Sequence, residues 1–185
     1  MSVQISKRLL TVSEYHKMAE AGILNEDDRV ELIHGEIIEM SPIGSRHSGH
    51  VKRILKLLVQ LLDDKATIGV QDPIVIDDFS EPEPDLSILE FREDFYEKEH
   101  PRPHQVFLII EVADSSLYYD RTTKLPIYAE AGIPECWIVN IEDEQIEIHK
   151  TPSQGDYLFK ETVKRNGTIF WERFDLTIKA SMILG

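Results

Sequence analysis

Three residues of this chain could together build a site for a divalent cation beside an activated water. Asp85 precedes a short apolar stretch, and Glu111 ends the apolar run Val106–Ile110, whose composition is typical of a central strand covered on both faces. Lys124 follows Glu111 by thirteen residues, near the start of a predicted helix. Mg²⁺ prefers carboxylate oxygens, taking one or two of them and keeping several waters. A nearby lysine could orient such a water or stabilise charge developing on a phosphate.

Each of these residues also has an ordinary structural interpretation. Asp85 could cap a turn in an acidic loop, and Glu111 could be one partner of an ion pair. Lys124 could lie on a solvated helix surface, with Arg121 as a competing cation. A carboxylate at the end of a buried strand is costly unless it is paired or binds a metal. Taken alone, the residues leave both interpretations open.

Three further side chains are weaker candidates for the same chemistry. Glu31 lies in an alternating apolar segment, so it either faces solvent or adds a third carboxylate if its hairpin packs across the site. His47 and His50 are three residues apart in one predicted helical turn, but no Cys or His cluster completes a zinc site. The sequence contains no Gly-rich phosphate loop, nucleophile-elbow serine or cysteine–histidine signature.

These residues must be positioned by helices and strands that the sequence predicts. The order of those elements indicates an α/β or α+β fold, with a mixed central sheet flanked by helices and preceded by an N-terminal helix and hairpin. A capping box at Thr11–Glu14 predicts a helix to about Ala21, and Arg29–Met40 predicts two strands that turn at His34-Gly35. Ser45–Leu62 is the clearest helix. The other predicted elements are strands at Gly69–Ile76, Asp85–Glu90, Val106–Val112 and Cys136–Ile141, a helix at about Arg121–Ala131 capped by Asp120, a hairpin of Gln145–Lys150 and Ser153–Lys160, and a strand at Thr168–Phe170.

The composition is that of a folded protein, and the length fits a single domain over residues 1–185. No apolar run approaches the roughly 20 residues of a membrane-spanning helix, and the N-terminus lacks the apolar stretch of a signal peptide, so no membrane partner is expected. The single cysteine, Cys136, reads as a buried thiol in a reducing, cytoplasmic compartment. A homodimer that uses the Trp137 and Trp171 regions is one alternative role.

The net charge of −14 opposes any association with nucleic acid, because DNA-binding domains usually present a basic face. The charge is uneven: residues 77–99 hold ten acids against two bases. A bound metal ion would offset part of this local acidity. Residues 91–105 form a charged loop that is long enough to be mobile.

Several motifs spread over residues 10–150 form a recognisable pattern. They are Val30–Ile37, Met40–Pro42, His47, Glu83–Leu86, Ile110–Val112, Asp120, Lys124–Tyr128 and Ala131–Val139. This pattern resembles the Uma-two family of putative restriction endonucleases, which belongs to the PD-(D/E)XK nuclease superfamily. The core of that superfamily is a mixed four-stranded sheet flanked by helices, and the last two motifs are the most specific part of the match.

The resemblance implies Mg²⁺-dependent hydrolysis of phosphodiester bonds in DNA, with Mn²⁺ as a substitute ion. Asp85 matches the metal-binding aspartate position of the superfamily, and Glu111 matches the second acidic position. Glu31 matches an N-terminal acid that such folds can use to complete the site. The implied mechanism has one or two ions held by these carboxylates, which lower the pKa of a bound water.

The chain departs from the superfamily pattern at the lysine. Two residues after Glu111 stands Ala113, where the superfamily has lysine. Members of this family resemble variants whose lysine has moved to the following helix, and Lys124 matches that relocated position. His47 and Gln71 are candidates for supporting the ligands. The alternative function is a catalytically silent domain of the same fold that binds a protein or nucleic-acid partner. The charge and the missing strand lysine favour it, whereas the retained carboxylates count against it.

Overall fold

The computed structural model describes residues 6–25 and 27–185, and its centre is a six-stranded sheet in the order β3-β4-β5-β6-β7-β8. The strands are β3 (Thr67–Val70), β4 (Leu86–Leu89), β5 (Val106–Ala113), β6 (Glu135–Asn140), β7 (Gln145–Ser153) and β8 (Asp156–Lys164). Only β5 and β6 pair in parallel, and the other neighbours are antiparallel. The predicted mixed sheet is confirmed, and it has two strands more than the four-stranded core of the superfamily.

The parallel pair explains why a helical segment lies between β5 and β6. Parallel neighbours need a crossover connection, which is usually helical. The crossover consists of α3 (Leu117–Tyr119), a π-helical turn at Asp120–Lys124, and α4 (Leu125–Glu130). It returns the chain across one face of the sheet, so residues of the crossover can meet side chains at the end of β5.

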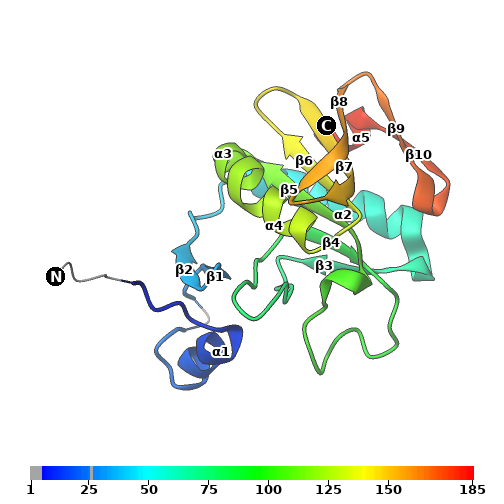
Figure 1. Cartoon of the computed structure of the whole chain (residues 1–185). Helices are drawn as coiled ribbons and strands as arrows, with labels where there is room; N and C mark the ends of the chain where they lie inside the picture. The colour runs from blue at the N-terminus through cyan, green and yellow to red at the C-terminus, as the bar shows by residue number, and fades with distance from the viewer. Residues whose placement is uncertain (1–5, 26) are drawn as a thin grey trace.

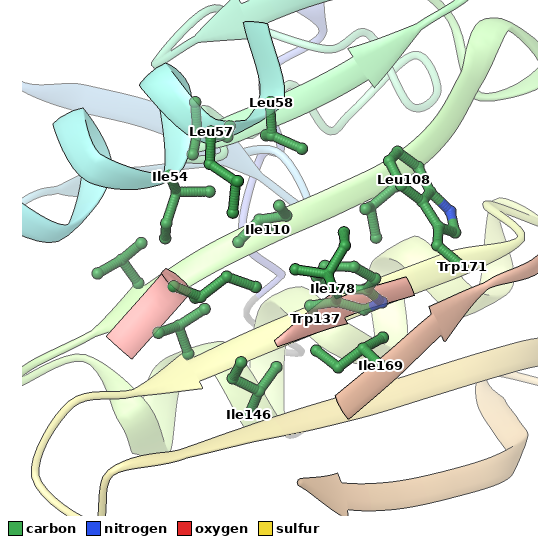
Figure 2. Close-up of a cluster of buried hydrophobic side chains, with 14 of the residues drawn as sticks. Ile54, Leu57, Leu58, Leu108, Ile110, Trp137, Ile146, Ile169, Trp171 and Ile178 are labelled. Carbon is green, nitrogen blue, oxygen red and sulfur yellow. The ribbon is translucent and has the colours of Figure 1, made fainter. Parts of the chain in front are cut away.

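The opposite face of the sheet packs against α2 (Ser45–Leu62), α5 (Ala180–Leu184) and the hairpin of β9 (Thr168–Trp171) and β10 (Leu176–Lys179). Figure 2 shows Ile54 and Leu58 of α2 beside Ile110 of β5, within the same buried cluster as both tryptophans. The indole rings of Trp137 and Trp171 meet edge to face, with centroids 5.7 Å apart. This apolar layer fixes the position of α2 against the sheet.

Alternation along β5 assigns its side chains to the two faces. Leu108, Ile110 and Val112 belong to the core beneath α2, whereas Ile109 and Ala113 pack beneath α4, beside Cys136. Glu111 has the same parity as Ile109, so its side chain lies on the α4 side. Burial of Cys136 agrees with the expected buried thiol.

The N-terminal elements gather at one end of the molecule, far from α5 (Figure 1). The predicted capping box is present at Thr11 and Glu14, and it opens α1 (Val12–Glu20). The predicted turn joins β1 (Val30–Ile33) to β2 (Glu36–Glu39), with positive φ at both His34 and Gly35, as a two-residue type I′ hairpin requires. Leu32 forms an antiparallel bridge with Glu81, which attaches the hairpin to the segment that precedes β4.

The strand predicted at Gly69–Ile76 is misplaced: β3 begins at Thr67 and ends at Val70, so the two share only Gly69 and Val70. Gln71 turns into the left-handed region at φ 55°, and the Asp72 carboxylate accepts the Val70 N–H, so the ladder cannot continue. β10 and α5 were not expected from the sequence. Short 3-10 turns lie at Asp63–Lys65, Pro103–Gln105 and Glu172–Phe174. In the described part of the chain, no helix is both long and apolar enough to cross a membrane.

Candidate active site

Six of the seven candidate site residues singled out from the sequence line one cavity of about 420 Å³ between the N-terminal hairpin, the start of α2, the sheet and the crossover, whereas His50 does not line it. The six are Glu31, His47, Gln71, Asp85, Glu111 and Lys124. The structure therefore brings together side chains that are up to 93 positions apart in the sequence. Their chemical roles stay predictions.

Asp85 lies immediately before β4 and is fixed by three neighbouring groups. Its Oδ2 accepts the Val112 N–H at 2.9 Å and lies 2.9 Å from Nε2 of His47, while Gln71 Nε2 donates to Oδ1 at 3.2 Å. Burial would raise the pKa of Asp85, but the His47 hydrogen bond and charge, the Val112 N–H and Lys124 lower it below its usual range. The same hydrogen bond raises the pKa of His47. Asp85 is therefore held as a carboxylate in a fixed orientation.

The left-handed backbone of Gln71 has a direct consequence for this contact. The Gln71 N–H donates to the Asp85 carbonyl at 3.2 Å, while its side chain reaches the Asp85 carboxylate. A non-glycine residue with positive φ is uncommon and costs conformational energy. The break that ends β3 thus also aims Gln71 into the cavity.

Glu111 is buried on the α4 side of β5, with 3% of its surface exposed. Tyr128 of α4 donates to Oε1 at 2.6 Å, and the Asp85 N–H donates to Oε2 at 3.3 Å. Burial, with Asp120 and Asp85 adding negative charge, raises the pKa of Glu111 to about 8 although Lys124 opposes the shift. Glu111 is thus a carboxyl group whose ionised form needs an additional positive charge.

Glu31 is the third carboxylate, and it faces the cavity and not solvent. Only 1% of its surface is exposed. Oε2 accepts the Glu83 N–H at 3.0 Å, and Oε1 accepts the Tyr119 hydroxyl at 2.9 Å. The bridge between Leu32 and Glu81 holds β1 at this position, so the hairpin does pack across the site.

The side chain of Lys124 enters the cavity from the crossover. The cavity therefore contains a lysine although Ala113 stands where the superfamily pattern has one. Lys124 Nζ lies 3.2 Å from Glu111 Oε1 and 3.4 Å from Glu31 Oε2, and it donates to the Glu83 carbonyl at 3.0 Å. Burial disfavours the charged amine, but the surrounding carboxylates outweigh it and raise the pKa of Lys124 above its ordinary value. Lys124 is a protonated, buried lysine, not a surface residue.

Asp120 does not cap a helix, contrary to the sequence expectation. The helical crossover begins earlier, at Leu117, and Asp120 opens the π-helical turn. Its carboxylate accepts the Ser116 hydroxyl at 2.7 Å, and burial raises the pKa of Asp120 to about 6. The turn places Asp120 and Lys124 on one side, where both line the cavity. Single π turns occur often at functional sites.

Sequence reasoning missed the two tyrosines that orient the glutamates. Tyr119 contacts Glu31 and Tyr128 contacts Glu111, and both come from the crossover. Tyr128 belongs to the motif Lys124–Tyr128, but a tyrosine on an apolar helix face gives no sign that its hydroxyl meets a carboxylate. The contact depends on the packing of α4 against β5.

Negative charge dominates the cavity. Among the described residues that line it, seven carry carboxylates and two are permanent cations: Glu31, Glu39, Glu83, Asp85, Glu111, Asp114 and Asp120 against Arg29 and Lys124. Such an excess is costly in a partly dry site unless another positive charge neutralises it. The carboxylate oxygens of Glu31, Asp85 and Glu111 fit a hard divalent cation such as Mg²⁺. In this structure Lys124 lies between Glu31 and Glu111 and supplies part of that neutralisation.

Comparison with known proteins agrees with the fold. A family model, Uma2, described as "Putative restriction endonuclease", matches residues 12–175. A solved structure described as a putative nuclease belonging to DUF820, from Anabaena variabilis ATCC 29413, superposes with a TM-score of 0.71 at 16% sequence identity. The superposition covers 95% of this chain and 97% of that chain. No curated protein matches. The family match spans most of the chain, and we conclude that this protein belongs to the Uma2 family.

Proposed function

We propose that this protein is a metal-dependent nuclease that hydrolyses phosphodiester bonds of DNA at the cavity around Asp85, Glu111 and Lys124. The observation that carries the proposal is that Glu31 and Glu111 both contact a single buried lysine in the cavity that the ionised Asp85 also lines. The description of the Uma2 family supports the reaction class. The excess of carboxylates supports the requirement for a cation.

Asp85 and Glu111 would hold Mg²⁺, or Mn²⁺ in its place, with Glu31 as an additional oxygen ligand. The ion would supply a water of lowered pKa and positive charge for the phosphate. Asp85 fits this role because its carboxylate is already ionised and fixed by His47, Gln71 and the Val112 N–H. Orientation of ligands by such outer contacts tunes metal sites generally.

Lys124 would place its ammonium group against the phosphate or the attacking water. Its protonated state suits electrostatic stabilisation and not the abstraction of a proton, since the carboxylates raise its pKa. The Glu83 carbonyl and the two glutamates direct Nζ into the cavity. Lys124 of the crossover can therefore take the role that a lysine in place of Ala113 would have on the strand.

The positive charge of α2 supports the binding of DNA beside the cavity, although the chain as a whole is acidic. The helix carries four bases and no acid, and Gly44 and His47 at its start line the cavity. Lys52, Arg53 and Lys56 are exposed along it. A basic strip next to the cavity would contact the phosphates flanking the bond to be cleaved.

The proposal is tested by incubating tag-free protein with supercoiled plasmid in the presence of Mg²⁺, Mn²⁺ or EDTA. Wild-type protein should nick the plasmid only with a divalent ion. Asp85→Asn should lose at least a hundredfold in rate because it removes a charged ligand and keeps the shape, while the distant exposed substitution Glu97→Gln should retain the wild-type rate. Metal binding without cleavage of DNA or RNA would favour the catalytically silent alternative.

A further inference from the structure

A second cluster of metal-binding side chains lies outside the cavity already described. Across residues 6–25 and 27–185, His16, Glu81 and His100 form the one group of three His, Cys, Asp or Glu residues whose ligand atoms all lie within 4.8 Å of one another. We propose that these three residues bind a borderline divalent transition-metal ion, with Zn²⁺ as the reference ion, and that the ion fastens together the three chain segments that carry them.

Glu81 is the buried ligand of this trio. Only 3% of its surface is exposed, and both carboxylate oxygens lie 2.9 Å from Nε2 of His16. Its backbone is fixed by the bridge to Leu32, in which the Glu81 N–H donates to the Leu32 carbonyl at 2.7 Å. A buried carboxylate requires a positively charged or hydrogen-bonding partner. A metal ion would meet that requirement.

His16 and His100 approach the carboxylate from two other segments. His16 lies in α1, and His100 lies near the end of the loop 91–105, with the two imidazole centroids 6.1 Å apart. Backbone hydrogen bonds hold the segments together: the Val12 N–H donates to the Asp78 carbonyl at 2.8 Å, and the Val75 N–H to the Pro101 carbonyl at 3.0 Å. The ligands are therefore close before any ion binds, and the exposed His100 side chain can complete the set by a small movement.

The donor set selects a different ion from the carboxylate cavity. Two imidazoles and one carboxylate are typical ligands of Zn²⁺, whereas oxygen-only sites suit Mg²⁺. Tetrahedral ligands at about 2.0–2.1 Å from zinc lie roughly 3.4 Å apart, and the ligand atoms of this trio all lie within 4.8 Å of one another. The cluster borders a groove of about 850 Å³, which leaves room for a water or an exogenous ligand at the fourth position.

The groove also carries an excess of negative charge, which favours a cation. Its lining includes five acids and three bases. The acids are Glu20, Asp77, Asp78, Glu97 and Glu99, and the bases are Lys17, Lys98 and Arg102. The surrounding field therefore supports cation binding in addition to the three ligands.

The test is calorimetric titration of Zn²⁺ into tag-free wild-type protein. At least one ion should bind per chain, and His16→Ala, Glu81→Gln and His100→Ala should each weaken the binding of one ion at least tenfold. His104→Ala is the matched control, because His104 is an exposed histidine of the same loop outside the cluster, and it should bind as wild type does. His100→Ala also controls for misfolding. Because the His100 side chain is exposed, this substitution should leave the Tm of metal-free protein unchanged.

Two further measurements separate this site from the carboxylate cavity. Co²⁺ should give the visible absorption of a tetrahedral nitrogen–oxygen site in wild-type protein and lose it in His100→Ala, while Asp85→Asn should keep it. Zn²⁺ should raise the Tm of wild type by more than that of His100→Ala. Absence of Zn²⁺ binding, undiminished binding by His100→Ala, or loss of binding in His47→Ala with retention in His100→Ala would each overturn the proposal.

Discussion

At the scale of single residues, the cavity is defined by an ammonium group that is shared among carboxylates. Lys124 contacts Glu31 and Glu111 directly, and Glu111 also receives hydrogen bonds from Tyr128 and the Asp85 N–H. One positive charge does not satisfy two buried glutamates, and the raised pKa of Glu111, to about 8, expresses this deficit. This shortage of positive charge predicts that stability and metal binding respond measurably to pH and to removal of Lys124.

The first prediction concerns the pH dependence of stability in metal-free protein. Glu111 has a higher pKa in the folded chain, about 8, than its ordinary value of 4.5, so its contribution favours folding at low pH and is lost as the pH rises towards 8. Between pH 6 and pH 8 the free energy of unfolding should fall by roughly 2 kcal/mol from this group. Urea unfolding with EDTA at both pH values measures it.

Glu111→Gln supplies the control for that pH effect, because glutamine keeps the shape and cannot ionise. It should lose less stability than wild type between pH 6 and pH 8, with a remainder from His47, whose pKa is also raised, while the exposed substitution Glu97→Gln should follow wild type. An equally steep loss of stability in Glu111→Gln would show that Glu111 is not the group responsible.

The second prediction concerns Lys124→Met, which removes the ammonium group and keeps most of the side-chain length. Breaking a buried ion pair leaves uncompensated charge, so metal-free stability should fall by about 3 kcal/mol. The same loss of positive charge should make the cavity bind Mg²⁺ more tightly than wild type, although plasmid cleavage should stop. Calorimetry and the nicking assay together check this. Weaker Mg²⁺ binding by the variant would contradict the electrostatic account.

At the scale of elements, the crossover between β5 and β6 does most of the positioning. Parallel pairing requires the crossover, and the π-helical turn within it brings Asp120 and Lys124 to the cavity. On the opposite side, α2 brings His47 to Asp85 and extends as a basic strip from the cavity. In the proposed function, these elements would supply both the carboxylate site and the route by which DNA approaches it.

The third prediction tests that route. The double substitution Lys52→Glu with Lys56→Glu on α2 should weaken DNA binding and lower the salt dependence of the binding constant, by a slope of about 2 if both lysines contact phosphates. The matched control is Lys160→Glu with Lys164→Glu on the edge strand β8, which should bind DNA nearly as wild type does. Fluorescence anisotropy of a labelled duplex in Ca²⁺ between 50 and 200 mM salt (roughly the range in which phosphate contacts are resolved) measures both.

Sequence reasoning correctly predicted the elements whose signals are local and missed those that depend on packing. The capping box at Thr11 and the apolar spacing of Ser45–Leu62 identified α1 and α2, because both signals lie within the helix itself. The end of β3 was misjudged because the left-handed turn at Gln71 leaves no clear mark in a β-like stretch. β10 is four residues long and depends on β9 for its pairing.

The same distinction applies to the site. Asp85, Glu111 and Lys124 could be named because the motifs of the family mark them, but nothing local indicated that Asp120 would line the cavity instead of capping a helix. The contacts of Tyr119 and Tyr128 with the glutamates arise only when the crossover packs on β5. Long-range contacts between segments are what the sequence pattern does not contain.

At the scale of the whole molecule, the acidity of the chain is distributed over distinct regions. The net charge of −14 includes the carboxylate cavity and the acidic segment 77–99, whereas α2 is wholly basic in its charged residues. In the proposed function, divalent ions would act on the global field as well as on the chemistry, since each would neutralise two charges near the surface that DNA would approach. A homodimer, a single domain over residues 1–185 and a cytoplasmic location stay predictions from the sequence.

The central claim is that Asp85 and Glu111 bind a divalent cation, and calorimetric titration of Mn²⁺ and Mg²⁺ into tag-free protein at pH 8 tests it most directly. His100→Ala serves as the background, so that the proposed zinc site cannot contribute. That variant should bind Mn²⁺ and Mg²⁺, and adding Asp85→Asn should weaken binding at least tenfold. Absence of divalent-ion binding in the His100→Ala background, or undiminished binding after Asp85→Asn, would contradict the account.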